Sequence, residues 1–208
     1  MIELPGFSAA RKWPAIAAGF VLVNALLVAV ATAPLRTPVP LPWTRLDEAI
    51  PLLPWTIFLY LGYFPFVFGA LCGLREQDNM NRVAASMLLA TAVTVPIFLI
   101  VPTAAPAVRI PELGGLNGFA LAATTHANHS FHNVFPSMHA GYALLAAMGY
   151  RDERRRWYPL ALAGAFLIAA STLLAKQHYV VDVPAGWLVA WACRSFVDRF
   201  VRFRFADA

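Results

Sequence analysis

The sequence contains few charged residues. Only 13% of its 208 residues are Asp, Glu, Lys or Arg, whereas 60% are hydrophobic, and the mean hydropathy is positive. A soluble globular protein of this length needs more polar surface than these residues can provide. The composition therefore excludes an ordinary soluble domain and predicts an integral membrane protein.

Cysteine is also scarce, with two residues in the chain. Cys72 and Cys193 both fall near the ends of apolar segments, on the side that the charge pattern below assigns to the cytoplasm. Disulfides are rare in that compartment, so we expect none. Both thiols are expected to pack as small apolar side chains.

Long apolar segments are abundant and predict an all-α, polytopic membrane protein with six transmembrane helices. A helix crosses a bilayer with about 20 predominantly apolar residues. Five segments are long enough or nearly so, and the sixth needs residues 133–136 or a tilt to cross. Residues 1–208 form a single membrane domain, with spans at about 13–33, 52–74, 83–101, 136–150, 157–175 and 180–198 and an outer loop at 102–135.

The basic residues predict how these spans are oriented. Short cytoplasmic loops are enriched in Lys and Arg. Six spans place most of the basic loop residues on the side of the two termini, and the opposite side receives only Arg36, Arg45, Arg109 and Lys176. The pattern predicts cytoplasmic termini in a bacterial inner membrane, with the other face toward the periplasm or exterior.

Two features of the chain ends have alternative interpretations. The C-terminal "RFVRFRF", Arg199–Phe205, alternates basic and aromatic residues as some nucleic-acid-binding surfaces do, but it adjoins a span and favours membrane-surface anchoring. No nucleic-acid partner is expected. Near the N-terminus, Arg11, Lys12 and a later Ala-Thr-Ala resemble a signal peptide, but the apolar run is too long for one. We favour an uncleaved first span.

Histidine is absent from the predicted cytoplasmic loops and from the middle of the spans. All the histidines fall on the predicted outer side, which places a site at the outer ends of the fourth to sixth helices; they are His126, His129, His132, His139 and His178. The loop 102–135 is also too long for a simple connection, a length that is typical of functional segments. We expect a partly helical, interfacial or re-entrant segment that covers the site.

The three histidines of this loop leave a metal site open as an alternative. His126, His129 and His132 are spaced three residues apart and could ligate zinc on one side of a helix. Residues 113–135 around them contain no carboxylate or cysteine. We therefore expect no metal and no cofactor, with His132 near the phosphate or headgroup of a substrate.

Two polar stretches lie at predicted span ends. "FPSMHAG" places Ser137 and His139 at the start of the fourth span, and "KQHYVVDVPAG" places His178 and Asp182 one helical turn apart. Asp182 can accept a hydrogen bond from one imidazole nitrogen and leave the other free to react. A plain helix-end ion pair, or a helix cap at Asp182 ahead of Pro184, would fit the same spacing.

Together these stretches resemble the second and third signatures of the type 2 phosphatidic acid phosphatase superfamily. The resemblance implies a membrane enzyme of about six helices. It also implies that His178 attacks phosphorus, that Asp182 orients His178, and that His139 protonates the leaving group. It covers roughly residues 50–186.

The sequence departs from the family pattern at two places. Thr172 stands where the third signature has an arginine, and the first signature, a lysine followed after six residues by Arg-Pro, is missing. "VPTAAPAVR", residues 101–109, and "IPLLPWTIFLY", residues 50–60, are more similar to the branch that contains fungal inositol phosphorylceramide synthases and bacterial relatives.

Phosphoryl transfer explains the residue types at this site. A neutral imidazole whose tautomer is fixed by a carboxylate is a competent nucleophile, and a second histidine can supply the proton of the leaving group. The phosphate oxygens need fixed donors. The candidates are the amides at the start of the fourth span, Ser137, Lys176 and Arg109.

The predicted function is that of a lipid phosphatase, metal-independent and acting at the outer leaflet through a phosphohistidine. Its partners would be a lipid phosphate substrate and the surrounding membrane lipids; no oligomeric state is predicted. One alternative is a phosphotransferase that moves a phospho-headgroup between lipids. Another is a non-catalytic membrane scaffold, which the missing arginine at Thr172 would allow. Tyr60 and Tyr63, one turn apart in the second span, are expected to be core residues rather than substrate contacts.

Overall fold

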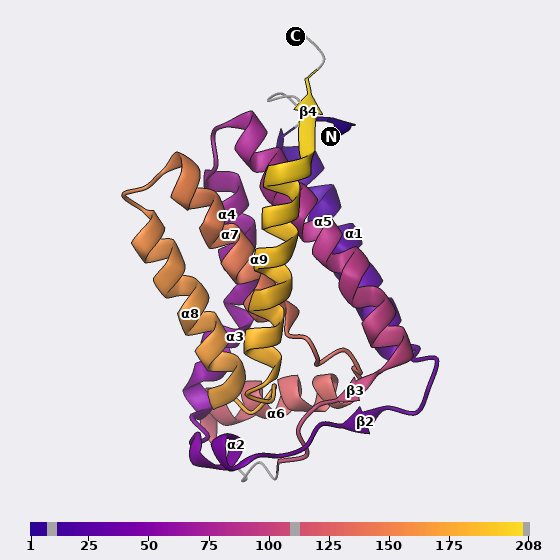
Figure 1. Ribbon diagram of the computed structural model, residues 1–208. Helices are drawn as coiled ribbons and strands as arrows, with labels where there is room; N and C mark the ends of the chain where they lie inside the picture. Colours follow the sequence, from indigo (N-terminus) through magenta and orange to yellow (C-terminus); the bar gives the residue numbers. More distant parts are fainter. Residues whose placement is uncertain (8–11, 109–112, 206–208) are drawn as a thin grey trace.

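The computed structural model describes residues 1–7, 12–108 and 113–205, and most of them are helical (Figure 1). In chain order the elements are β1 (Ile2–Pro5), α1 (Lys12–Thr32), β2 (Val39–Pro40), α2 (Arg45–Ala49), the 3-10 helix η2 (Pro54–Thr56), α3 (Ile57–Leu61), α4 (Tyr63–Gly73), α5 (Gln77–Ile100), β3 (Thr103–Ala104), α6 (Gly115–His129), α7 (Met138–Glu153), α8 (Tyr158–Leu174), α9 (Asp182–Phe200) and β4 (Val201–Arg204).

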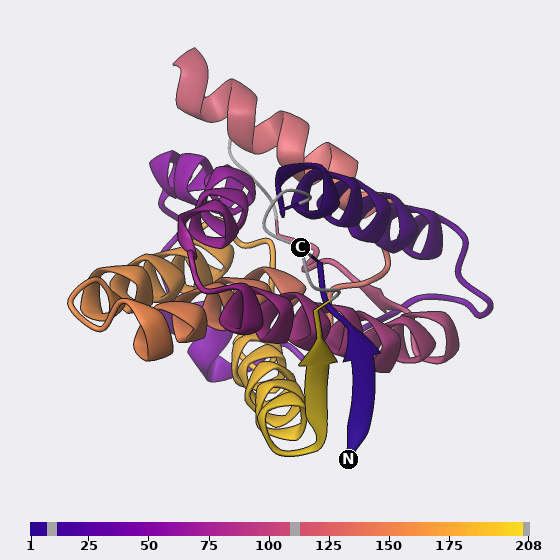
Figure 2. The ribbon, with the colours of Figure 1, turned by 90° about the horizontal axis from the view of Figure 1, so that it is seen from above.

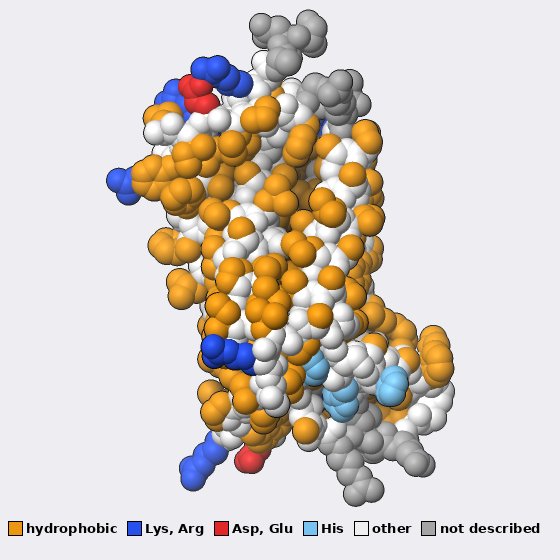
Figure 3. Space-filling view, turned by 90° about the vertical axis from the view of Figure 1, so that its right-hand side faces the viewer, with side chains coloured by type: hydrophobic (Ala, Val, Ile, Leu, Met, Phe, Trp, Pro, Cys, Tyr) orange, Lys and Arg blue, Asp and Glu red, His pale blue; other side chains and the backbone are white. Residues whose placement is uncertain are grey.

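The helices have the character of an all-α membrane protein. In the described part of the chain, three helical segments are long and apolar enough to cross a bilayer, namely α1, α5 and the run Pro54–Gly73. Helix α8 is apolar but shorter. On the face formed by α1 and α5, hydrophobic side chains cover the middle of the molecule and charged ones lie toward its ends (Figure 3).

The second predicted span is interrupted. Helix α3 ends at Leu61 and α4 begins at Tyr63, with Gly62 between them. Pro65 lies in the first turn of α4 and has no N–H to donate to the carbonyl of Leu61, so a continuous helix would lose a hydrogen bond there. Tyr60 and Tyr63, on either side of this break, both line the site described below.

The two ends of the molecule differ in construction (Figure 1). Both termini lie at one end, where β1 pairs in parallel with β4. The other end carries α2, the parallel pair of β2 and β3, and the connection from α8 to α9. Helix α6, which falls within the predicted outer loop, lies across this second end. Histidine side chains also gather there (Figure 3).

Helix α7 lies in the centre of the bundle because small residues let its neighbours approach closely. It packs against α4, α5, α8 and α9. A Cβ atom added to Gly186 in α9 would lie 2.1 Å from the carbonyl oxygen of Ser137, and one added to Gly141 would lie 3.0 Å from the carbonyl oxygen of Gly186. Side chains larger than hydrogen would separate the first turns of α7 and α9.

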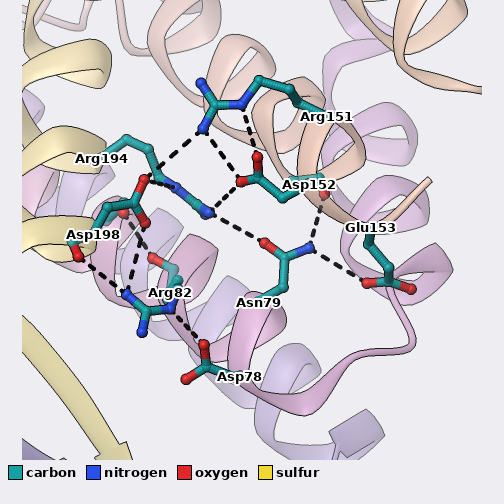
Figure 4. A network of polar contacts seen from close by, with 10 residues as sticks. Asp78, Asn79, Arg82, Arg151, Asp152, Glu153, Arg194 and Asp198 are labelled. Atoms are coloured by element: carbon teal, nitrogen blue, oxygen red, sulfur yellow. Dashed lines mark hydrogen bonds and ion pairs between the residues drawn. The ribbon is translucent and has the colours of Figure 1, made fainter. Parts of the chain in front are cut away.

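A polar network joins α5, α7 and α9 near the termini (Figure 4). The buried guanidinium of Arg194 donates to Asn79 Oδ1 at 3.2 Å, to Asp152 Oδ2 at 2.8 Å and to Asp198 Oδ2 at 3.0 Å. Arg82 also pairs with Asp198. These partners explain how the arginine side chain is buried between the three helices.

Candidate active site

His178 and Asp182 form a buried pair at the end of the molecule that carries α6. His178 Nδ1 lies 3.0 Å from Asp182 Oδ2, and the amide of Tyr179 donates to the same oxygen at 2.8 Å. An ionised carboxylate can only accept, so Nδ1 is the donor and the lone pair of Nε2 remains free. The one-turn spacing in the sequence thus corresponds to a direct contact. Within the described chain, Asp182 Oδ1 has no hydrogen-bond partner and Oδ2 accepts only from residues ahead of α9, so the carboxylate does not cap that helix.

Ser137 lies beside the free nitrogen of His178. Its Oγ is 3.4 Å from His178 Nε2, and it also caps α7 by accepting from the amide of Ala140 at 3.4 Å. The amide of Ser137 donates to the carbonyl of Asp182 at 3.0 Å. The unbonded amides of the first turn of α7 therefore lie close to His178 Nε2, an arrangement that suits an anion.

His139 lies next to His178 and is held by aromatic rings. The centroids of the two imidazoles are 5.7 Å apart. Tyr60 stacks on His139 at 4.5 Å, and the ring of Tyr63 lies 4.6 Å away. Both tyrosines are buried, as expected of core residues, but they also line the cavity at the site, so the expectation of core packing alone was incomplete.

A cavity of about 430 Å³ opens in front of both histidines. Its walls come from α1, α3, α4, α6 and the segment that leads into α7. Apolar side chains make up most of the wall, and polar groups gather near His178. This combination is typical of a site for an amphipathic small molecule.

Asn128 and Gln177 are cavity residues that the sequence analysis did not identify. Asn128 Nδ2 donates to Gln177 Oε1 at 2.7 Å and to the hydroxyl of Tyr60 at 3.1 Å. Gln177 Nε2 donates to Thr125 Oγ1 at 2.9 Å. These bonds tie α6 to the residue that precedes His178. The adjacency of Gln177 to His178 was the available signal, whereas Asn128 carried none beyond its place in the histidine-rich loop.

Lys176 lies elsewhere than expected. Its Nζ donates to the carbonyls of Asp47 at 2.6 Å and Ile50 at 2.5 Å and lies 5.2 Å from the centroid of the Trp43 ring. Lys176 is not among the described residues that line the cavity. Its left-handed backbone, with φ of 56°, turns the side chain toward α2 instead of toward His178. This corrects the expectation that Lys176 lies beside the phosphate.

The segment around α2 holds the loop that carries His178. Asp47 Oδ1 accepts from the amide of Val180 at 2.8 Å. Burial lowers the pKa of Lys176, an effect that the charge of Asp47 opposes. Burial by itself would raise the pKa of Asp47, but the hydrogen bonds from Thr44 and Val180, together with the charge of Lys176, bring it below its ordinary value.

Two further residues were predicted to contact the phosphate, Arg109 and His132. Arg109 lies outside the described residues. The backbone amide of His132 donates to the carbonyl of Ala31, and its carbonyl accepts from the amide of Thr103. Its side chain is not among the described residues that line the cavity. Its buried Nδ1 has no partner within the described chain. Among the residues described, no group of three His, Cys, Asp or Glu side chains is placed to hold a metal ion.

Residues 49–195 match the PAP2 superfamily, a range that contains both polar signatures and covers well over half of the chain. The chain belongs to the PAP2 superfamily. The resemblance to type 2 phosphatidic acid phosphatases is thereby confirmed. Membership indicates a membrane enzyme with a phosphatase- or phosphotransferase-type activity. Helix α1 lies outside the matched range.

A shorter similarity connects this PAP2 protein to an archaeal relative. Over 61 residues it is 38% identical to an uncharacterized protein of Methanocaldococcus jannaschii, which amounts to 29% of this chain and 25% of that protein. The match therefore spans about a quarter of the relative's length.

Proposed function

We propose that this PAP2 protein is an integral membrane lipid phosphatase that hydrolyses a lipid phosphate ester through a phosphohistidine on His178. The observation that carries the proposal is the bond from His178 Nδ1 to the buried Asp182, with Nε2 free beside Ser137 and next to the cavity. Asp182 fixes the tautomer and stabilises the positive charge that develops on the ring.

The first chemical step is the transfer of the phosphoryl group to His178. The lone pair of Nε2 attacks phosphorus, the bond from phosphorus to the lipid oxygen breaks, and His139 gives its proton to the leaving oxygen. The hydroxyl of Ser137 and the first amides of α7 donate to the phosphoryl oxygens, where negative charge is concentrated.

The second step returns the enzyme to its starting state. His139, now lacking that proton, takes one from a water molecule as the water oxygen attacks phosphorus. The bond between phosphorus and Nε2 breaks, and inorganic phosphate leaves. No metal or cofactor takes part in the proposed sequence.

The proposed topology has six membrane-spanning helices, formed by α1, the run Pro54–Gly73, α5, α7, α8 and α9. The connections α4–α5 and α7–α8 lie at the end of the molecule with the termini (Figure 1); the first contains Arg75 and the second contains Arg154, Arg155 and Arg156. This asymmetry supports cytoplasmic termini in a bacterial inner membrane and a site at the outer leaflet.

Transfer to a second lipid alcohol is the runner-up function, as in the branch that contains inositol phosphorylceramide synthases. The polar side chains of Asn128 and Gln177 near His178 favour it, because a hydroxyl acceptor would need such partners. A non-catalytic scaffold is disfavoured by the intact geometry of His178, Asp182 and Ser137.

A panel of lipid phosphomonoesters and phosphodiesters, incubated with a lipid alcohol and the purified protein in detergent and in the presence of a chelator, tests the proposal. Release of inorganic phosphate supports hydrolysis, whereas a new phosphodiester lipid without phosphate release supports transfer. If neither product forms with any lipid, the proposed activity is wrong. Activity that needs added zinc would contradict the metal-free mechanism.

A further inference from the structure

Helix α1 borders the candidate active site although it lies outside the range that matches the family. Leu27, Val28 and Ala31 of α1 line the cavity that contains His139 and His178. The family match begins at residue 49, after α1 has ended. Figure 2 shows α1 and α6 on the same side of the bundle. Helix α1 of this protein therefore forms part of the wall of the site.

A second hollow continues from this wall along α1. It has a volume of about 80 Å³ and lies between α1, α4 and α5, where Ala15, Gly19 and Val23 face Val67 and Met87. Asn24 lines both this groove and the cavity of the active site, so the two adjoin at this residue. The groove leads away from the histidines toward the end of the molecule with the termini.

The groove is suited to a hydrocarbon chain. Among the described residues that line it, none is charged. The side-chain Nδ2 of Asn24 donates back to the carbonyl of Phe20 at 2.7 Å, which occupies one of its two N–H groups within α1. A Cβ atom added to Gly19 would meet nothing within 4 Å, so free space remains where α1 faces the groove. Mostly apolar walls favour an apolar occupant.

The length of the path indicates a long chain. Ala31 lines the cavity and Ala15 lines the far part of the groove, sixteen residues earlier in the same helix. At 1.5 Å per residue the path between them is about 24 Å. One leaflet accounts for about half of the ~30 Å hydrocarbon core, so a chain that fills the path extends beyond one leaflet.

We infer that the groove between α1, α4 and α5 binds the apolar chain of the substrate and selects for long chains. The inference rests on the proposed function, because the head of that chain must carry the phosphate that reaches His178. The hydrocarbon chain of the substrate passes Asn24 and continues past Val23 and Gly19 toward Ala15. Helix α1 then determines the chain-length preference of the enzyme.

Filling the groove tests this inference. Gly19→Phe, with Gly19→Leu as a smaller second variant, places a side chain in the free space. The matched control is Val21→Phe on the same helix, because Val21 is 66% exposed and does not line the groove. The kcat/KM values for hexadecyl phosphate and octyl phosphate are measured for each protein in the same detergent.

We expect the ratio of kcat/KM for hexadecyl phosphate to that for octyl phosphate to fall about tenfold or more in the Gly19 variants, because the long chain loses its place. The ratio should stay at the wild-type value in Val21→Phe. Equal ratios in all the proteins would refute binding of the hydrocarbon chain in the groove while leaving the phosphatase proposal intact.

A binding measurement separates the groove from the activity. A hexadecyl phosphate that carries a photoactivatable group at its far end is crosslinked to His178→Ala protein, and the labelled peptides are identified. We expect labels on α1 near Ala15 and on the facing parts of α4 and α5, and their loss in His178→Ala with Gly19→Phe. Labels confined to other helices would refute the groove whether or not turnover is detected.

Discussion

His178 has one free ring nitrogen, and the proposed reaction depends on it. Replacing His178 with Ala removes the nucleophile, so we expect turnover and any acid-labile phosphoenzyme to disappear. Radiolabelled substrate followed by acid quench and gel analysis measures the phosphoenzyme. A matching gel-filtration profile in detergent serves as the folding control. A phosphoenzyme that still accumulates in this variant would show that another residue is attacked.

Lys176 is expected to position the loop rather than bind phosphate. Lys176→Met keeps the length of the side chain but removes the bonds from Nζ to the carbonyls of Asp47 and Ile50. We expect a lower Tm and a lower kcat, because buried carbonyls lose their partners and the loop of His178 loosens. The Ki of inorganic phosphate as a competitive inhibitor separates the two roles. The Ki should stay near the wild-type value. A rise of tenfold or more would show that Lys176 binds phosphate.

Asp47 makes the stability of the same loop depend on pH. Its pKa in the folded protein is lower than the ordinary 3.8, so its stabilising effect is present above that value and is lost as the pH falls through the folded-state pKa. In Asp47→Asn we expect a lower Tm near neutral pH and a smaller further loss of Tm as the pH is lowered below the ordinary pKa of 3.8. Thermal unfolding in detergent from neutral to acidic pH measures both. Parallel Tm profiles for the two proteins would contradict the role of Asp47.

At the scale of secondary-structure elements, the close contact of α7 and α9 sets the geometry of the site. In Gly186→Ala the new Cβ would lie 2.1 Å from the carbonyl oxygen of Ser137, so the two helix starts must move apart. Overpacking of this kind typically costs about 1–3 kcal/mol. We expect a lower Tm and a kcat reduced more than KM changes, because Ser137 moves away from His178.

Gly69→Ala in α4 is the matched control for this prediction, because its new Cβ meets nothing within 4 Å. Alanine is otherwise favoured over glycine inside a helix by roughly 0.5–1 kcal/mol. The control should therefore match or exceed the wild-type Tm. A Gly186→Ala protein that behaves like this control would contradict the tight contact.

Some features of these elements could be predicted from the sequence, and others could not. Apolar length places the ends of α1 and α8 within one residue, whereas α5 begins six residues before the apolar segment at 83–101. The four-residue spacing of His178 and Asp182 requires only local geometry. The bond between Asn128 and Gln177 joins residues 49 positions apart, and no local pattern indicates it. The direction of the Lys176 side chain depends on the left-handed backbone conformation of Lys176 itself, which lysine seldom adopts.

At the scale of the whole molecule, the distribution of charge predicts which face of the membrane carries the site. The variants Arg36→Cys and Arg155→Cys, each made in a protein whose Cys72 and Cys193 are replaced with Ala, report on the two ends, because both arginines are exposed. Arg36 lies at the end with α6, and Arg155 lies in the connection from α7 to α8 at the opposite end.

We expect a membrane-impermeant maleimide to label the Arg36→Cys protein in intact bacterial cells and to label the Arg155→Cys protein only after permeabilisation. The reason is that the arginine-rich connection between α7 and α8 is expected to stay in the cytoplasm, and the end with His178 would then face outward. Residual turnover of both variants confirms that they are folded. The opposite labelling pattern would place the site at the cytoplasmic leaflet, and the substrate would then have to be a lipid phosphate of that leaflet.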